Sequence, residues 1–258
     1  MGVRINTNLE ALNAQRNLSA TAVSFGKSVE KLSSGLRINR AADDAAGLGI
    51  SETFRGQVKG LNQAMRNAQD GISLIQTGEG ALNEVHSMLQ RIRELAVQYN
   101  NGTNDANAQA SIQSEADALQ TTIASIGSNT KFNGISLLTA GTVTLQVGAN
   151  AGETQDVTTT LLDTSAADVT DLSTIDAVIA DVSTQRAAFG AAQNALEHTV
   201  NSISVAAENF TASESRIRDL DVAAEMVNFT KSQILQQAGT AILAQANQAP
   251  QSVLSLLK

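Results

Sequence analysis

Two histidines and one adjacent acidic pair are the side chains of this sequence whose types are suited to chemistry. A histidine metal site needs two of them at ligand spacing, whereas His86 and His198 are isolated and each falls in a segment of helical periodicity. Asp43 and Asp44 could act as general acid and base only beside an opposed pocket, and the sequence shows no polar cluster to build one. We therefore expect no catalytic, metal-binding or cofactor-binding residue, two exposed helical histidines and a structural role for the acidic pair.

The composition of the 258 residues also favours a structural protein over an enzyme. No Walker-type or GxGxxG loop is present to bind a phosphate. With no Trp, one Tyr and six Phe, the interior must be filled by Leu, Ile, Val and Ala, which suits thin seams between helices better than a thick core. The absence of cysteine excludes disulfides and thiolate metal sites.

The charge distribution limits the possible partners. A net charge of −8 argues against binding to nucleic acid. Between Lys131 and Arg186 there is no Lys or Arg, so we expect a solvated acidic surface there. No 18-residue apolar stretch could span a bilayer, and the first residues lack the apolar run of a cleaved signal peptide. We expect no membrane insertion and, for an exported protein, another export route.

Seven-residue repeats of apolar side chains identify the elements that position these residues. An unbroken repeat of seven keeps one stripe of a helix facing a partner, so each repeat predicts a long helix built for side-by-side packing. The first ladder is Leu61, Ala68, Ile75, Leu82, Leu89 and Ala96, and the second is Ile175, Val182, Phe189, Leu196, Ile203, Phe210 and Ile217. A companion stripe changes side near Gly78 and Gly80, where glycine tolerates the shift.

Thinner helical patterns flank the two ladders. An amphipathic segment over about residues 5–36 weakens at Gly35, and a joint rich in Ala, Asp and Gly follows over residues 39–49. A charged cluster over residues 213–221 interrupts the second ladder, and a final helix runs over about residues 222–257. The terminal segments therefore mirror each other, which predicts that they pair.

The segment between the ladders contains a third helix and a β-element. Residues 100–102 end the first long helix, and Asn104 or Asp105 caps an antiparallel neighbour that stops near Gly127. Residues 135–162 alternate with a period of two and predict a β-hairpin with a loop rich in Gly and Asn.

Together these elements predict a mainly α fold, a long antiparallel helical rod or coiled coil of N- and C-terminal segments with the hairpin at its outer end. Residues 1–43 with 220–258 would form a terminal coiled-coil domain, and residues 44–219 an outer helical rod domain. Because the thin terminal stripes have only each other, we expect them to fray in the monomer and to become ordered in an assembly. The residues expected to mediate polymerisation are Ile5, Leu9, Leu12, Ile234, Ile242, Leu254, Leu256 and Leu257.

Four motifs in the chain resemble bacterial flagellin, the subunit of the flagellar filament. They are INTN at residues 5–8, SSGLRINRAADDAAGL at 33–48, LQRIRELAVQ at 89–98 and QILQQAGTAILAQANQAPQSVLSLL at 233–257. The chain is similar to a minimal flagellin without variable outer domains. The resemblance implies type III export, an extracellular filament for swimming, and partners that include further copies, an export chaperone, and cap and hook-associated proteins.

The resemblance also implies roles for particular residues. Host flagellin receptors of the Toll-like class would recognise Arg91, Glu94 and Leu95 together with Glu115, on a surface that also packs between subunits. Cytosolic inflammasome sensors would recognise the terminal leucines already named. The joint between the terminal and outer domains would be formed by Arg37, Asn39, Asp43, Asp44, Arg218 and Asp219.

Two other structural classes remain open from the sequence alone. A hook-filament junction protein shares the terminal coiled coils, although its ends usually match these motifs less fully. A free coiled-coil adaptor would share the ladders but would stop at a small oligomer, whereas flagellin seeded with filament fragments grows long filaments, so sedimentation separates the two.

Overall fold

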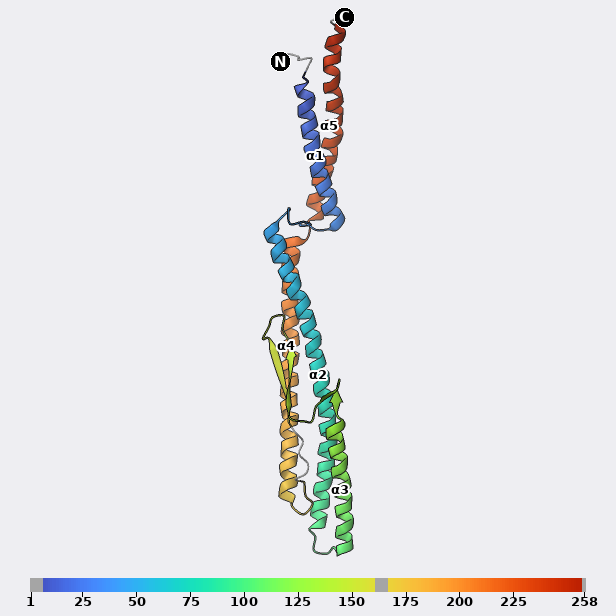
Figure 1. Ribbon diagram of the computed structural model, residues 1–258, viewed down its shortest axis with the longest axis vertical. Coiled ribbons are helices and arrows are strands. Elements are labelled where there is room, and N and C mark those ends of the chain that lie inside the picture. Colours follow the sequence, from blue (N-terminus) through green and yellow to red (C-terminus); the bar gives the residue numbers. More distant parts are fainter. Residues whose placement is uncertain (1–6, 161–166, 257–258) are drawn as a thin grey trace. The chain divides into compact units, whose positions relative to one another are not determined.

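A computed structural model describes residues 7–160 and 167–256 of the chain, with only the backbone described beyond residue 248. The fold is mainly helical, as the ladders predicted (Figure 1). In chain order the elements are α1 (Leu9–Ser34), α2 (Ala45–Tyr99), α3 (Ala106–Asn129), β1 (Lys131–Phe132), β2 (Ile135–Ser136), β3 (Gly141–Gln146), β4 (Thr154–Thr159), α4 (Leu172–Arg218) and α5 (Val222–Leu256). They form two compact units. Unit 1 comprises Met1–Arg55 with Phe210–Lys258, and unit 2 comprises Gly56–Asn209.

In unit 1 the two terminal helices, α1 and α5, lie side by side and antiparallel (Figure 1). Near one end the Asn8 side chain caps α1 by accepting from the Ala11 N–H at 3.1 Å, and its amide donates to the Ala246 carbonyl at 2.7 Å. Further along, the rings of Phe25 and Phe229 stack with centroids 5.0 Å apart. The predicted pairing of the chain ends is therefore confirmed.

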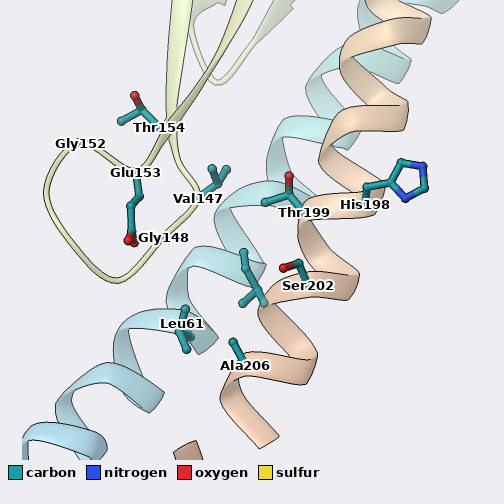
Figure 2. A pocket seen from close by; sticks show the side chains of 11 residues that line it. Leu61, Val147, Gly148, Gly152, Glu153, Thr154, His198, Thr199, Ser202 and Ala206 are labelled. Carbon is teal, nitrogen blue, oxygen red and sulfur yellow. The ribbon is translucent and has the colours of Figure 1, made fainter. Parts of the chain in front are cut away.

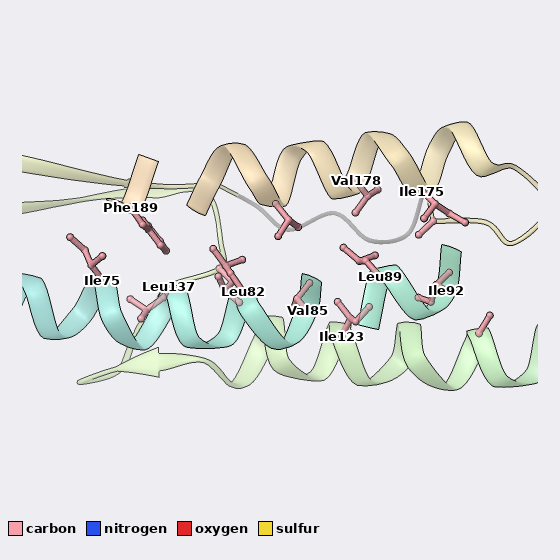
Figure 3. Close-up of a cluster of buried hydrophobic side chains, with 14 of the residues drawn as sticks. Ile75, Leu82, Val85, Leu89, Ile92, Ile123, Leu137, Ile175, Val178 and Phe189 are labelled. Carbon is pink, nitrogen blue, oxygen red and sulfur yellow. The ribbon is translucent and has the colours of Figure 1, made fainter. Parts of the chain in front are cut away.

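Unit 2 is built around both ladders. All six residues of the first ladder are buried, as are the five second-ladder residues from Ile175 to Ile203. Side chains of α2, α3 and α4 meet in one core, to which Leu137 also contributes (Figure 3). Because an unbroken repeat of seven keeps one stripe inward, the periodicity correctly identified the core of these helices.

One glycine of the first ladder helix is required by packing. A Cβ at Gly78 would lie 2.8 Å from Cε2 of Phe189, whereas a Cβ at Gly80 would meet open space. The two glycines, which the sequence grouped together, therefore differ. Gly78 makes room for the largest buried side chain of α4, and Gly80 has no such neighbour.

The β-elements are two antiparallel ribbons. The predicted hairpin is confirmed as β3 and β4, which pair Val143 with Val157 and are shorter than the 135–162 segment. A second ribbon, β1 and β2, was missed. Its turn has Asn133 at φ 48° and Gly134 at φ 83°, positive values typical of an Asn-Gly hairpin turn.

Two predicted boundaries were wrong. Helix α2 begins at Ala45, inside the expected 39–49 joint, because Asp44 caps it by accepting from the Gly47 N–H at 2.9 Å. Helix α3 ends at Asn129, near Gly127 as predicted. Helix α4 continues through residues 213–218, since Ser, Glu and Arg on an exposed face are compatible with a helix, and the interruption is confined to residues 219–221.

Candidate assembly and recognition surfaces

The terminal helix pair fully buries no large apolar side chain among its described residues. Over the described parts of α1 and α5, the only buried side chains are Ser28 and Ser232. Ten large apolar side chains of these helices are exposed: Leu9, Leu12, Val23, Val29, Val222, Met226, Val227, Ile234, Leu235 and Ile242. An apolar surface of this extent marks an interaction site.

The predicted polymerisation residues are part of this surface wherever their side chains are described. Leu9, Leu12, Ile234 and Ile242 are 57%, 49%, 63% and 57% exposed. Ile5 and Leu257 lie outside the described residues, and Leu254 and Leu256 lie on the backbone-only end of α5.

The joint begins where Gly35 ends α1 in the left-handed conformation, at φ 70°. The residues that follow Gly35 form hydrogen bonds to the last carbonyls of α4. The Arg37 N–H donates to the Arg218 carbonyl at 2.7 Å, and its guanidinium donates twice to the Ile217 carbonyl, at 3.1 and 2.6 Å. The Leu220 N–H returns a bond to the Gly35 carbonyl at 3.0 Å. Carbonyls that would otherwise be unpaired at the end of a helix are thereby bound.

Asp43 orders the loop before α2. Its Oδ2 accepts from the backbone N–H groups of Arg40, at 3.0 Å, and Asn39, at 3.2 Å. These bonds hold the pKa of the Asp43 carboxyl below its ordinary value, because they favour the charged form. The Asn39 amide in turn donates to Ser34 Oγ at 2.8 Å. Asp43 and Asp44 therefore act as backbone acceptors, which agrees with their expected structural role.

Arg218 forms the second polar contact of the joint. Its guanidinium donates to Glu52 Oε1 at 2.7 Å and its side chain is 14% exposed. Glu52 also accepts from Arg55 at 2.9 Å, and the bonds from Arg218 and then Arg55 hold the pKa of the Glu52 carboxyl below its ordinary value. Asp219 accepts from Ser215 Oγ at 2.6 Å. Sequence reasoning missed Glu52, which lies inside a helix and is recognisable only from its partner.

These two depressed pKa values give the joint a pH dependence. A carboxyl whose folded pKa is lowered contributes stability above its unfolded pKa and loses it as the pH falls through the folded value. We expect the difference in unfolding free energy between the wild type and the Asp43→Asn, Glu52→Gln variant to be constant near neutral pH. It should shrink as the pH falls below the ordinary values of 3.8 and 4.5. Urea unfolding followed by amide exchange in unit 1 measures it, and a difference that persisted throughout the acid range would contradict it.

The residues implied in receptor recognition lie at the junction of α2 and α3. Arg91 donates to Glu115 Oε1, at 2.9 Å from Nη2 and 3.1 Å from Nε, and to Glu94 at 3.0 Å. All three charged side chains are about half exposed or more. Leu95 is instead 1% exposed and belongs to the core beneath them. The structure thus brings three of the four residues together at the surface.

The histidines are placed differently from each other. His198 is exposed, while His86 is half-buried, with Nε2 3.0 Å from Gln90 Nε2. His198 borders a pocket of about 510 Å³ between the β3–β4 loop and α4, which Leu61 of α2 also lines (Figure 2). Within residues 7–160 and 167–256 there is no group of three metal-binding side chains. None of the described helices is apolar over enough of its length to cross a membrane.

Comparison with known proteins covers nearly the whole chain. Residues 5–144 match the bacterial flagellin N-terminal helical region and residues 172–257 match the bacterial flagellin C-terminal helical region. The flagellin of Halalkalibacterium halodurans is 53% identical, over 98% of this chain and 99% of the relative. The flagellin of Bacillus subtilis is 48% identical, over 99% and 100%. A crystal structure of Bacillus cereus flagellin superposes with a TM-score of 0.50 and 31% identity, covering 58% of this chain and 94% of that one.

Proposed function

Because this chain belongs to the bacterial flagellin family and is thus a non-enzymatic subunit of the extracellular filament used for swimming, we propose that α1 and α5 are the surfaces through which its copies polymerise. The observation that carries the proposal is the row of ten exposed apolar side chains on these two helices. Neighbouring copies would cover the exposed part of each side chain, which is about half of it, and full burial of a large apolar side chain contributes about 1.5–3 kcal/mol.

The chain divides into two domains with different functions. We assign residues 1–43 with 220–258 to the inner, polymerising domain and residues 44–219 to the outer helical domain. The separate core of unit 2 supports this division, since that unit buries the first ladder and the five second-ladder residues from Ile175 to Ile203 without help from the terminal helices. The proposal favours flagellin over the hook-filament junction protein and the adaptor, because both halves of the chain match flagellin regions.

Amide exchange tests whether the terminal helices depend on assembly. In the monomer we expect weak protection over residues 8–34 and 222–248 and strong protection in unit 2, because the terminal pair buries almost no apolar side chain. In the filament the terminal residues should become protected. Unit 2 is the internal control. Strong protection of the terminal segments in the monomer would overturn their dependence on neighbours.

Family membership also supports specific partners. We propose that the chain is exported unfolded by the flagellar type III route and meets an export chaperone, the cap and the hook-associated proteins. A strain lacking the export apparatus should retain the protein inside the cell.

We further propose that host flagellin receptors recognise the exposed cluster formed by Arg91, Glu94 and Glu115. The support is its exposure and its match to LQRIRELAVQ. Leu95 would act indirectly by packing under the helix, and Leu95→Ala would cost about 2–5 kcal/mol of stability. A loss of signalling in the Leu95→Ala variant could therefore result from loss of folding as well as from loss of receptor contact. The terminal leucines Leu254, Leu256 and Leu257 remain proposed contacts of inflammasome sensors on family grounds.

A matched pair of arginine variants tests receptor recognition. Arg91 and Arg93 are both 50% exposed and ion-paired, the first with Glu115 on α3 and the second with Asp176 on α4. Arg91→Ala monomers should lose about tenfold or more in receptor signalling, because arginines dominate many interfaces. Arg93→Ala should stay close to the wild type in a reporter-cell assay. Equal potency of the Arg91 variant and the wild type would remove the assignment.

A further inference from the structure

The turn between α2 and α3 carries chemistry that filament assembly does not use. The sequence contains two Asn-Gly pairs, Asn101-Gly102 in this turn and Asn133-Gly134 between β1 and β2. Glycine has no side chain to hinder its backbone nitrogen as it approaches the preceding side-chain amide. We propose that Asn101 is a site of spontaneous deamidation and that Asn133 is protected by its turn.

The surroundings of Asn101 favour the reaction. Asn101 and Gly102 are exposed, as are Asn133 and Gly134, and a Cβ at either glycine would meet no atom within 4 Å, so steric room alone does not separate the two pairs. The Asn101 backbone is held by two bonds of 3.1 Å, from its N–H to the Gln98 carbonyl and from the Asn104 N–H to its carbonyl, and a rotation there separates no strands. Among the described residues, no backbone or side-chain acceptor binds the Gly102 N–H, and its nitrogen is free to attack. The Thr103 N–H makes a long bond to Asn101 Oδ1, at 3.4 Å. Negative charge develops on this oxygen during attack, so the donor stabilises the transition state.

The surroundings of Asn133 oppose the same reaction. Asn133 and Gly134 form the turn that directly follows Phe132↔Ile135, the inner of the two cross-strand pairs of the ribbon. Positive φ values at Asn133 and Gly134 define the two-residue turn. Bringing the Gly134 nitrogen onto the side-chain carbon requires rotation about the Asn133 backbone, which would break this turn and separate the strands.

The reaction needs only water. The Gly102 nitrogen bonds to Asn101 Cγ, the bond from Cγ to the side-chain nitrogen breaks, and that nitrogen leaves as ammonia with the proton from Gly102. Water then opens the resulting succinimide at either carbonyl and gives aspartate or isoaspartate. One neutral amide becomes a carboxylate, so the formal charge changes from −8 by −1 to −9. The new charge lies after the last turn of α2, which has no basic residue, and is unfavourable there.

Peptide mapping of the full-length monomer, aged in ¹⁸O-labelled water at mildly alkaline pH, tests the proposal. In the folded protein Asn101 should deamidate about tenfold faster than Asn133, with ¹⁸O and isoaspartate in its product. In urea the two rates should converge. Gly102→Ala should slow the reaction at Asn101, and Gly80→Ala, at an open site far along α2, should not.

Three results would overturn the deamidation proposal. If Asn133 reacted as fast as Asn101 in the folded protein, the protecting role of its turn would be wrong. If the rates differed as much in urea as in buffer, the difference would belong to local sequence and the structural argument would fail. An unchanged rate in Gly102→Ala would exclude the attacking nitrogen. None of these outcomes depends on whether α1 and α5 mediate polymerisation.

Discussion

Replacement of Val227 and Ile234 by aspartate should abolish filament formation and leave unit 2 folded. These side chains are 66% and 63% exposed and lie seven residues apart on one face of α5. In the monomer the new carboxylates remain in water and cost little. In the filament each would be buried without a partner, at a cost of several kcal/mol per charge.

The measurement is negative-stain microscopy after seeding, combined with circular dichroism of the monomer. The control exchanges the same positions conservatively, as Val227→Ile with Ile234→Val, and should polymerise normally because the apolar face is kept. A chain without residues 1–30 should likewise give a soluble helical core and no filaments. Filaments of ordinary length from the aspartate variant would show that this face is not an interface.

The largest effect on stability is expected at Phe189. Its ring is 1% exposed in the core of unit 2 and packs against the backbone of Gly78. Truncation to alanine should cost about 3–5 kcal/mol, because a cavity remains between helices that can collapse only partly. Urea unfolding followed by circular dichroism measures this cost. A loss below about 1 kcal/mol would mean that the helices close the gap, contrary to the tight packing described.

Substitutions at Gly78 and Gly80 test the contact with Phe189 separately from helix propensity. Gly80→Ala should stabilise α2 by up to about 1 kcal/mol through helix propensity alone. Gly78→Ala gains the same propensity but forces Phe189 to move, at about 1–3 kcal/mol. In a Phe189→Leu background the penalty at position 78 should fall, because the ring atom that meets the new Cβ is gone. Additive effects in this cycle would contradict the contact.

The ladders could be predicted because periodicity alone decides which helix face is buried. The burial of Leu95 was equally readable, since it follows Ile92 by three residues and precedes Ala96, and both belong to the buried side of α2. The ribbon of β1 and β2 escaped because its strands have two residues each, although the Asn133-Gly134 pair is a recognised turn signal.

The joint could be predicted only in part. The glycine stop at residue 35 is a local signal and was predicted, whereas the Asp44 cap before α2 is equally local but was not. The bonds from Arg37 to Ile217 and from Arg218 to Glu52 join residues 180 and 166 positions apart. No local pattern specifies such partners, because several exposed arginines and carboxylates would satisfy the same chemistry.

The long sequence separation between Arg37 and Ile217 has a consequence for folding during synthesis. During synthesis this arginine emerges early, whereas the carbonyl of Ile217 that it binds follows 180 residues later. At about 5–20 residues per second the wait is roughly 10–40 s. A chain that ends before residue 217 therefore cannot form this contact, even though its first ladder is already complete. The contact therefore forms only in a chain that extends at least from Arg37 to Ile217.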